Sequence, residues 1–334
     1  MKEYTANLQI LTPCFCVGAD NRQAELRAPS VRGQLRWWFR VLGGTPAPEL
    51  EKSLFGGVHK LPSEREDDEH TAASKIIVRT AVTDAKFGSP AELPQQNRPG
   101  YYLLHFANVS SRAKGEKGPG PRVQNQAWFA PYTAFQISVL ERRPMTDQEV
   151  ARFQQTWKAF LLLGSLGLRQ TRGFGAFAPM EPIATETVVA QLKELKRTGV
   201  DSWIVTMPNG APAYSNEWKE AMIRLEAVLG YLRQNRFSAG QSGKNPTPLG
   251  TSSNPRQASA LHLRPIRTSE GILPVVFFTP QILGESSQMR LADFKRTLAN
   301  AMDIRTPYKQ QIPDPATDTR TQIALTPCQN FLTT

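Results

Sequence analysis

The sequence has little of what catalysis and metal binding usually require. Its 334 residues include four histidines and three cysteines. These are His59, His70, His105 and His262, and Cys14, Cys16 and Cys328. The histidine spacing fits no metal-binding motif, and three cysteines are too few for a disulfide framework. We therefore expect a reducing compartment, no bound metal and no cofactor.

Long apolar segments are missing as well. No run approaches the ~20 apolar residues that cross a membrane, and the first residues, Met-Lys-Glu-Tyr, lack the apolar core of a signal peptide. A cytoplasmic protein without a membrane partner is expected. Acidic residues are outnumbered, because 40 Lys and Arg against 29 Asp and Glu give a net charge of +11. This imbalance favours an anionic partner, most commonly nucleic acid.

Residues 25–44 are predicted to form a helix with two chemically different faces. Ser30 can cap its first turn, and Gly43 and Gly44 can end it. At about 100° per residue the apolar side chains share one arc, which predicts that Trp38 and Phe39 are buried. The arc comprises Val31, Leu35, Trp38, Phe39 and Leu42.

A stripe of arginines lies beside this arc. It comprises Arg32, Arg36 and Arg40, and Arg27 precedes it. No acidic residue occurs between Leu26 and Pro48, so nothing nearby in the sequence neutralises the stripe. Trp37 is predicted to lie outside the core, where it can stack on an unpaired base or dock a neighbouring subunit. We predict that this face binds an anion; an ordinary solvated arginine face is the alternative.

The order of predicted elements indicates an α+β protein. In the first half, strands alternate with the helix above and with a second helix that begins at a capping box, Thr146 to Glu149. The strands are expected at residues 4–17, 75–82, 101–106 and 132–140 and through Phe177. This arrangement is similar to the β-α-β-β-α-β order of ferredoxin-like folds, whose RNA-recognition version uses the open sheet face.

The second half looks like a worn copy of the first. Helices are expected at residues 185–197, 215–232 and 289–302, and strands at 202–206, 258–266 and 272–278. We therefore predict two tandem ferredoxin-like, or RRM-like, folds with inserted loops. The predicted domains are residues 1–182 and 183–334.

A polar, basic segment at residues 108–125 interrupts the first half. It contains Lys114, Lys117 and Arg122. Its composition is typical of a solvated insertion or of an arm that becomes ordered on nucleic acid.

Glycines cluster directly after the second helix. They are Gly164, Gly167, Gly173 and Gly175. In P-loops and dinucleotide-binding motifs the glycines follow a strand and precede a helix, and the reversed order here argues against ATP or NAD. Arg169, Arg172 and Phe174 lie in the same loop. Backbone N–H groups beside arginines suit a nucleic-acid backbone, and a helix stop followed by a tight turn is the alternative.

Several of these motifs together resemble the RAMP superfamily of CRISPR proteins, and most closely the first-subunit family of the type III-B Cmr effector complex. They are Thr12-Pro13, residues 25–40, Leu54-Phe-Gly-Gly57 and Arg172-Gly-Phe-Gly175, with a weaker match at residues 256–263. The resemblance implies tandem ferredoxin-like folds that bind CRISPR guide RNA and target single-stranded RNA near the 3′ end of the guide. It also implies a hetero-oligomeric complex with other Cmr subunits, which cut the target.

Three functions are compatible with the sequence. The first is a non-catalytic RNA-binding subunit in antiviral defence, which we expect. The second is a RAMP-type endoribonuclease that processes guide RNA, but its general base would have to be the remote His59, or its metal would need carboxylates such as Asp20 and Glu25. The third is a structural adaptor, which does not explain why the basic residues concentrate in two segments. We predict no catalytic residue.

Overall fold

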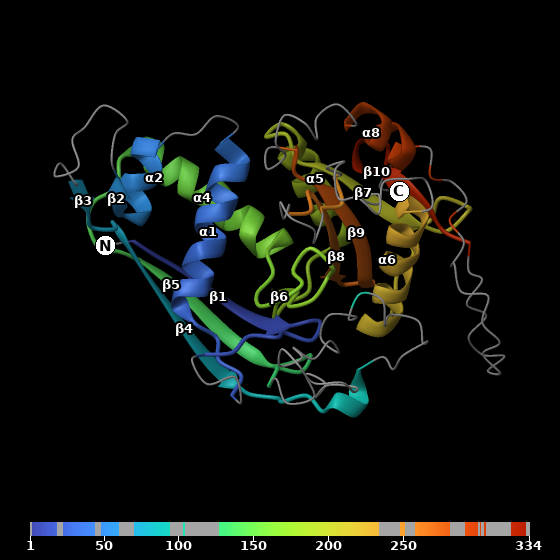
Figure 1. Ribbon diagram of the computed structural model, residues 1–334, viewed down its shortest axis with the longest axis horizontal. Helices are drawn as coiled ribbons and strands as arrows, with labels where there is room; N and C mark the ends of the chain where they lie inside the picture. Colours follow the sequence, from blue (N-terminus) through green and yellow to red (C-terminus); the bar gives the residue numbers. More distant parts are fainter. Residues whose placement is uncertain are drawn as a thin grey trace, which may run out of the picture.

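The computed structural model describes residues 2–18, 23–43, 48–59, 70–93, 103, 127–233, 248–250, 258–280, 291–299, 301, 304 and 322–331. Two four-stranded antiparallel sheets dominate it, and they lie side by side in Figure 1 with helices packed on each. The α+β class with two ferredoxin-like folds is therefore confirmed.

The first sheet has the strand order β4-β5-β1-β6. Its strands are β1 (Glu3–Ile10), β4 (Ile76–Asp84), β5 (Ala134–Glu141) and β6 (Phe177–Pro179). Helices α1 (Ala28–Gly43) and α4 (Asp147–Leu163) cover the same face of this sheet in Figure 1 and contact each other. If the four strands are numbered along the chain, their order across the sheet is second, third, first, fourth, which is the ferredoxin-like order.

The second sheet repeats this topology with the strand order β10-β7-β9-β8. Its strands are β7 (Asp201–Thr206), β8 (Leu261–Thr268), β9 (Gly271–Phe278) and β10 (Ala324–Pro327). Its helices are α6 (Trp218–Leu232) and α8 (Leu291–Ala299), and α5 (Thr185–Lys196) precedes β7. The predicted domain boundary after residue 182 falls between β6 and α5 and stays a prediction.

Five short elements complete the described structure. Helix α2 (Pro48–Phe55) leads into a small hairpin of β2 (Gly57–His59) and β3 (His70–Ala72). Single turns of 3-10 helix occupy Pro90–Glu92 (η1) and Cys328–Asn330 (η5). The sequence suggested only a turn at Leu54-Phe-Gly-Gly57, yet that turn ends an eight-residue helix, because Gly56 adopts a φ of 65° that stops it.

Other boundaries differ for local reasons. The first strand ends at Ile10 instead of residue 17, because the N–H groups of Leu11 and Thr12 both donate to the Ala176 carbonyl, which breaks the regular strand pairing. Helix α1 begins at Ala28, so Ser30 lies inside it and does not cap it, and Pro29 is tolerated in the first turn. The strand expected at residues 101–106 lies outside the described residues except for Leu103, which is helical. Ser215 pairs with Ile272 instead of capping α6.

The capping box of α4 is confirmed, and its glutamate does more than cap. Thr146 Oγ1 accepts a hydrogen bond from the Glu149 backbone N–H, and Glu149 Oε2 accepts one from the Thr146 N–H at 2.7 Å. Lys75 Nζ donates to both Glu149 oxygens at 2.8 Å, and Ser53 Oγ donates to one. Burial acts to raise the pKa of Glu149, but these donors outweigh it and lower the pKa to about 2. One carboxylate thus ties α4 to α2 and to the segment before β4.

The two folds share their apolar interior. One cluster joins Leu8 of β1 and Trp38 of α1 to Val275 and Phe277 of β9. A second cluster contains Phe174 of the first fold among the side chains of the second. The seam between the folds is therefore packed with apolar side chains like a domain core, and the positions of residues near it depend on contacts from both halves of the chain.

Candidate nucleic-acid interface

The arginine stripe on α1 has an acidic partner that the sequence analysis missed. Arg36 Nε donates to Glu51 Oε1, and Arg40 donates to both Glu51 oxygens, at 2.6 and 2.7 Å. Arg32 donates to the carbonyl oxygen of Phe55. Glu51 and Phe55 belong to α2, so the absence of acidic residues up to Pro48 did not mean an unneutralised stripe. The available signal was the sequence Pro-Glu-Leu-Glu, which is typical of the first turn of a helix.

The neutralisation by Glu51 is partial. Two guanidinium groups share one carboxylate, and the Arg40 side chain stays 61% exposed while that of Glu51 is 11% exposed. Burial acts to raise the pKa of Glu51, but the hydrogen bonds from Arg40 and Arg36 outweigh it and hold the pKa below its usual value. Arg27 is exposed and lies 3.9 Å from Glu25. This face therefore carries accessible positive charge around one carboxylate that neutralises it in part.

The burial of Trp37 and Trp38 differs in part from the prediction, which placed Trp37 outside the core and Trp38 inside it. Trp38 and Phe39 are buried, as expected. Trp37 is half-buried and packs against the same cluster, with its ring 4.9 Å from that of Trp38 and 5.3 Å from His262 on β8. The prediction that Trp37 lies outside the core is therefore wrong in part. The helical wheel could not show this, because His262 comes from the other fold.

The glycine-rich loop is held in place by the Thr12-Pro13 segment. Thr12 Oγ1 donates to the carbonyl of Gly173 at 2.7 Å and accepts from the Ala176 N–H at 3.0 Å, and the Gly175 N–H donates to the Pro13 carbonyl at 2.9 Å. Gly175 has a φ of 64°, and a Cβ there would lie 1.7 Å from the Leu166 oxygen. Only glycine fits such a position, and the hydrogen bonds above hold the Thr12-Pro13 segment against the glycine-rich loop.

The same contacts correct the expected role of the loop backbone. The N–H groups of Gly164, Gly173 and Gly175 already donate to carbonyl oxygens, those of Phe160, Gln170 and Pro13. Gly164 is buried and Gly167 half-buried, and the φ of Gly167 is 83°. Phe174 is buried against Phe15 and offers no face to a base. The tight-turn alternative describes these residues better than a phosphate cradle does.

The two arginines of the loop differ in environment. Arg169 is half-exposed, with a φ of 61° that is unusual for a residue other than glycine. Arg172 is 8% exposed and donates to Ser259 Oγ at 3.3 Å and to the Leu249 carbonyl at 3.0 Å. Burial, together with the nearby charge of Arg169, lowers the pKa of Arg172 to about 10. Arg172 therefore binds the second fold and does not face solvent, as an arginine that contacts phosphate would.

The structure gives less information about the other predicted site residues. Lys114, Lys117, Arg122 and Asp20 lie outside the described residues, and His59 ends β2. Among the residues that the structure describes, no group of three or more His, Cys, Asp or Glu side chains is arranged to hold a metal ion. Within the same residues, no helix combines the length and apolarity needed to cross a membrane.

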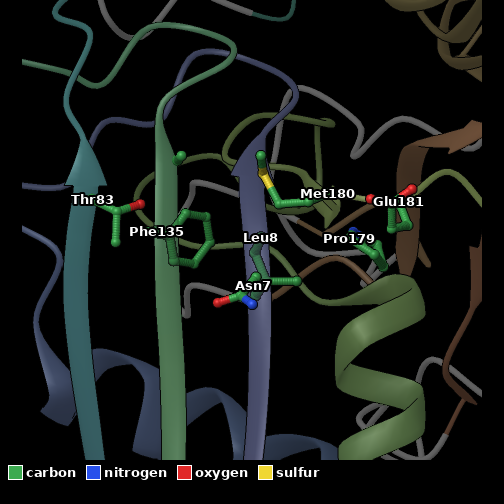
Figure 2. Close-up of a pocket in the computed structure, with 8 residues that line it drawn as sticks. Asn7, Leu8, Thr83, Phe135, Pro179, Met180 and Glu181 are labelled. Carbon is green, nitrogen blue, oxygen red and sulfur yellow. The ribbon is translucent and has the colours of Figure 1, made fainter.

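A pocket of about 500 Å³ lies on the first sheet, away from the arginine face. Figure 2 shows Asn7, Phe135 and Thr83 on three neighbouring strands, with Met180 and Glu181 beside them. The charged side chain in its lining is the carboxylate of Glu181. A phosphate is disfavoured next to a carboxylate without a neighbouring cation, so this lining suits a nucleic-acid backbone less well than the arginine face does.

The chain belongs to the RAMP superfamily, whose sequence pattern matches residues 7–178. That span contains α1, α2 and the glycine-rich loop. Within the superfamily the chain resembles Cmr1. It is 33% identical over 193 residues to the CRISPR system Cmr subunit Cmr1-2 of Pyrococcus furiosus, an alignment that covers 53% of this chain and 94% of that protein.

Two solved structures share the fold. The crystal structure of Cmr1 from Pyrococcus furiosus in its apo form superposes with a TM-score of 0.53 at 18% identity, covering 85% of this chain and 90% of the other. A chain in the cryo-EM structure of the type III-B Cmr-beta complex bound to cognate target RNA and AMPPnP, in the presence of ssDNA, gives a TM-score of 0.50 at 11% identity. It covers 82% of this chain and 93% of the other.

Proposed function

We propose that this protein is a non-catalytic RNA-binding subunit of a type III-B CRISPR effector complex, acting in the cytoplasm in antiviral defence. Its partners are guide RNA, target single-stranded RNA and the other Cmr subunits, and its contacts lie near the 3′ end of the guide. Membership of the RAMP superfamily and the likeness to Cmr1 support this proposal. The observation that carries it is the partly neutralised arginine face of α1 beside the half-buried Trp37.

The proposed contacts are those that the structure leaves accessible. Arg27, Arg32, Arg36 and Arg40 of the α1 face and Arg169 of the glycine loop are exposed or half-exposed. The exposed part of Trp37 can stack on a base next to the phosphates that these arginines bind. Arg172 is omitted because its guanidinium is inside the protein. RNA cleavage by other subunits requires no base or metal here, and the proposal assigns none.

Charge reversal on α1 is expected to weaken RNA binding. About four to five phosphate contacts at roughly 0.7 each predict a slope of about −3 when the logarithm of the affinity is plotted against the logarithm of the salt concentration. The double substitution Arg36→Glu and Arg40→Glu should lower the affinity at least ~10-fold and make the slope shallower by about 1.4. Anisotropy titrations of a labelled single-stranded RNA measure both, and gels of the same samples should show intact RNA with or without Mg²⁺.

A matched control reverses Arg142 and Arg143, two exposed arginines that follow β5 at the opposite end of the sheet from the β1–β6 pairing. This variant has the same net charge and should bind nearly as wild type does. Equal losses in both double variants would show that overall charge, and not the α1 face, determines binding. Fragments that accumulate in the gels would instead support a guide-processing nuclease.

Replacing Glu51 by Gln is expected to strengthen RNA binding about 3- to 10-fold. The carboxylate now holds Arg36 and Arg40, and RNA has to replace it. Gln keeps the shape and one acceptor oxygen but removes the competing charge. The measurement is the same titration, and the neighbouring exposed carboxylate Glu49 supplies a control in Glu49→Gln. Weaker binding by Glu51→Gln would show that the carboxylate orients the arginines for RNA and does not compete with it.

A further inference from the structure

The edges of the two sheets meet at a small pocket. Strand β6 ends the first sheet and β8 ends the second, and the two strands are in contact. Together with α4 and α5 they enclose about 150 Å³. Leu161, Phe177 and Ile266 form an apolar part of the lining, called the floor from here on, and polar side chains also line the pocket. These are Lys158, Gln191 and Arg267.

A third cation lies directly beneath this floor. Arg264 of β8 is 1% exposed, and its guanidinium stands 5.2 Å from the centre of the Phe177 ring. Its Nη2 donates to the Phe177 carbonyl at 2.7 Å and, with Nε, to the Leu162 carbonyl at 3.4 Å. Both of these residues line the pocket. Nη1 is buried and has no hydrogen-bond partner among the described residues.

No carboxylate balances these three cations in the part of the chain that the structure describes. Lys158 is exposed and Arg267 half-exposed, and neither forms an ion pair with a described residue. Burial lowers the pKa of Arg264 to about 9, so the group keeps its charge at neutral pH. A buried charge without a counter-ion is unfavourable, and it raises the potential in the low-dielectric space around it. The electrostatic potential of the pocket therefore favours a negatively charged ligand.

The shape of the pocket narrows the class of ligand. At ~30 Å³ per water molecule, its volume equals that of about five waters, which is enough for one phosphate group but not for a whole nucleotide. The apolar floor suits the flat face of a base or the carbon atoms of a ribose. Lys158 supplies a point charge, and Arg267 supplies the planar fork that matches two phosphate oxygens.

We propose that this pocket at the seam binds the backbone of single-stranded RNA at one nucleotide, with the phosphate between Lys158 and Arg267 and the edge of the adjoining ribose or base against the apolar floor. Arg264 strengthens the site through its charge without touching the ligand. The inference rests on the proposed RNA-binding function and adds a contact from α4, α5, β6 and β8 to that of α1. The same chemistry is offered by a free nucleotide, so the test includes one.

The test compares three proteins in two assays. The double variant Lys158→Glu and Arg267→Glu changes surface side chains only, and Arg142→Glu with Arg143→Glu is again the control of equal charge. With labelled single-stranded RNA, the pocket variant should bind at least ~10-fold more weakly, with a salt slope shallower by about 1.4, from two contacts at roughly 0.7 each. The control should stay within about 2-fold of wild type. In the second assay, adenosine 5′-monophosphate and inorganic phosphate are added during thermal unfolding.

The two assays separate the possible results. A melting temperature that adenosine 5′-monophosphate raises in wild type but not in the pocket variant, with equal RNA affinities, identifies a free nucleotide as the ligand and supports the site. RNA affinity and melting shifts that match the control overturn it. If wild type binds no RNA, the proposed function fails, and the melting shifts alone decide the pocket.

A variant of the buried cation gives an independent readout. Arg264→Met fills a similar volume without charge, and such replacements of buried charges are often tolerated. The folded variant should bind RNA about 3- to 10-fold more weakly than wild type while keeping the wild-type salt slope, because Arg264 touches no phosphate. Unchanged affinity in the folded variant contradicts its assigned role. If the variant does not fold, the surface double variant still decides the proposal.

Discussion

Trp38→Ala is expected to lower the free energy of unfolding by about 3–5 kcal/mol, the usual cost of emptying a large aromatic site in a core. Trp38 is 1% exposed, and its ring lies 4.9 Å from that of Trp37 and 5.7 Å from that of Phe277. Phe277 belongs to β9 of the second fold. The cavity would therefore open in the seam, and both folds should lose stability together.

Guanidinium chloride unfolding followed by far-UV circular dichroism measures this effect. The control is Phe87→Ala, because Phe87 is exposed and stacks on one ring, that of Phe129. It should change stability by less than about 1 kcal/mol. A Trp38→Ala protein that unfolds at the wild-type denaturant concentration would show that the seam is not a stabilising core.

Arg172→Glu is expected to destabilise the protein by about 3–5 kcal/mol, whereas Arg172→Met should be far milder. The glutamate would place an unpaired negative charge beside the Leu249 carbonyl, in a site that burial keeps dry. Methionine loses the hydrogen bonds to Ser259 and Leu249 but leaves no charge. The same denaturant titrations measure both variants.

The RNA-binding behaviour of these variants distinguishes a structural arginine from a phosphate ligand. Folded Arg172→Met should keep the wild-type salt slope, while Arg169→Glu, in the half-exposed part of the same loop, should bind RNA more weakly with little change in stability. A slope that becomes shallower by about 0.7 in Arg172→Met would restore Arg172 as a phosphate contact.

Periodicity and caps predicted what local sequence determines. The buried arc of α1, the capping box at Thr146 and the repeated ferredoxin-like topology all follow from spacings within one element or from element order. Helix α2 was missed because prolines around residue 46 indicated a loop, although Pro48 fits the first turn of a helix. Strand β10 was missed because four residues among prolines carry no period.

The errors at the site have a common physical cause. Arg172 meets Ser259 and Leu249, which are 87 and 77 residues away in sequence, and Trp37 meets His262 across the same seam. A helical wheel or a loop motif records only neighbours along the chain. Whether an arginine faces solvent or another fold is decided by distant residues, so the sequence indicated which residues gather in the stripe and the loop but not how exposed they are.

The shared seam also affects how the chain folds during its synthesis. Trp38 leaves the ribosome long before Phe277, since 239 residues separate the two rings that pack together. At ~5–20 residues per second, translation takes roughly 12–48 s to supply the missing partner. Throughout that interval, the apolar surface of the first fold that the second fold buries in the finished protein is exposed to water. The nascent chain is therefore most exposed to aggregation and to chaperone binding during translation of the second half.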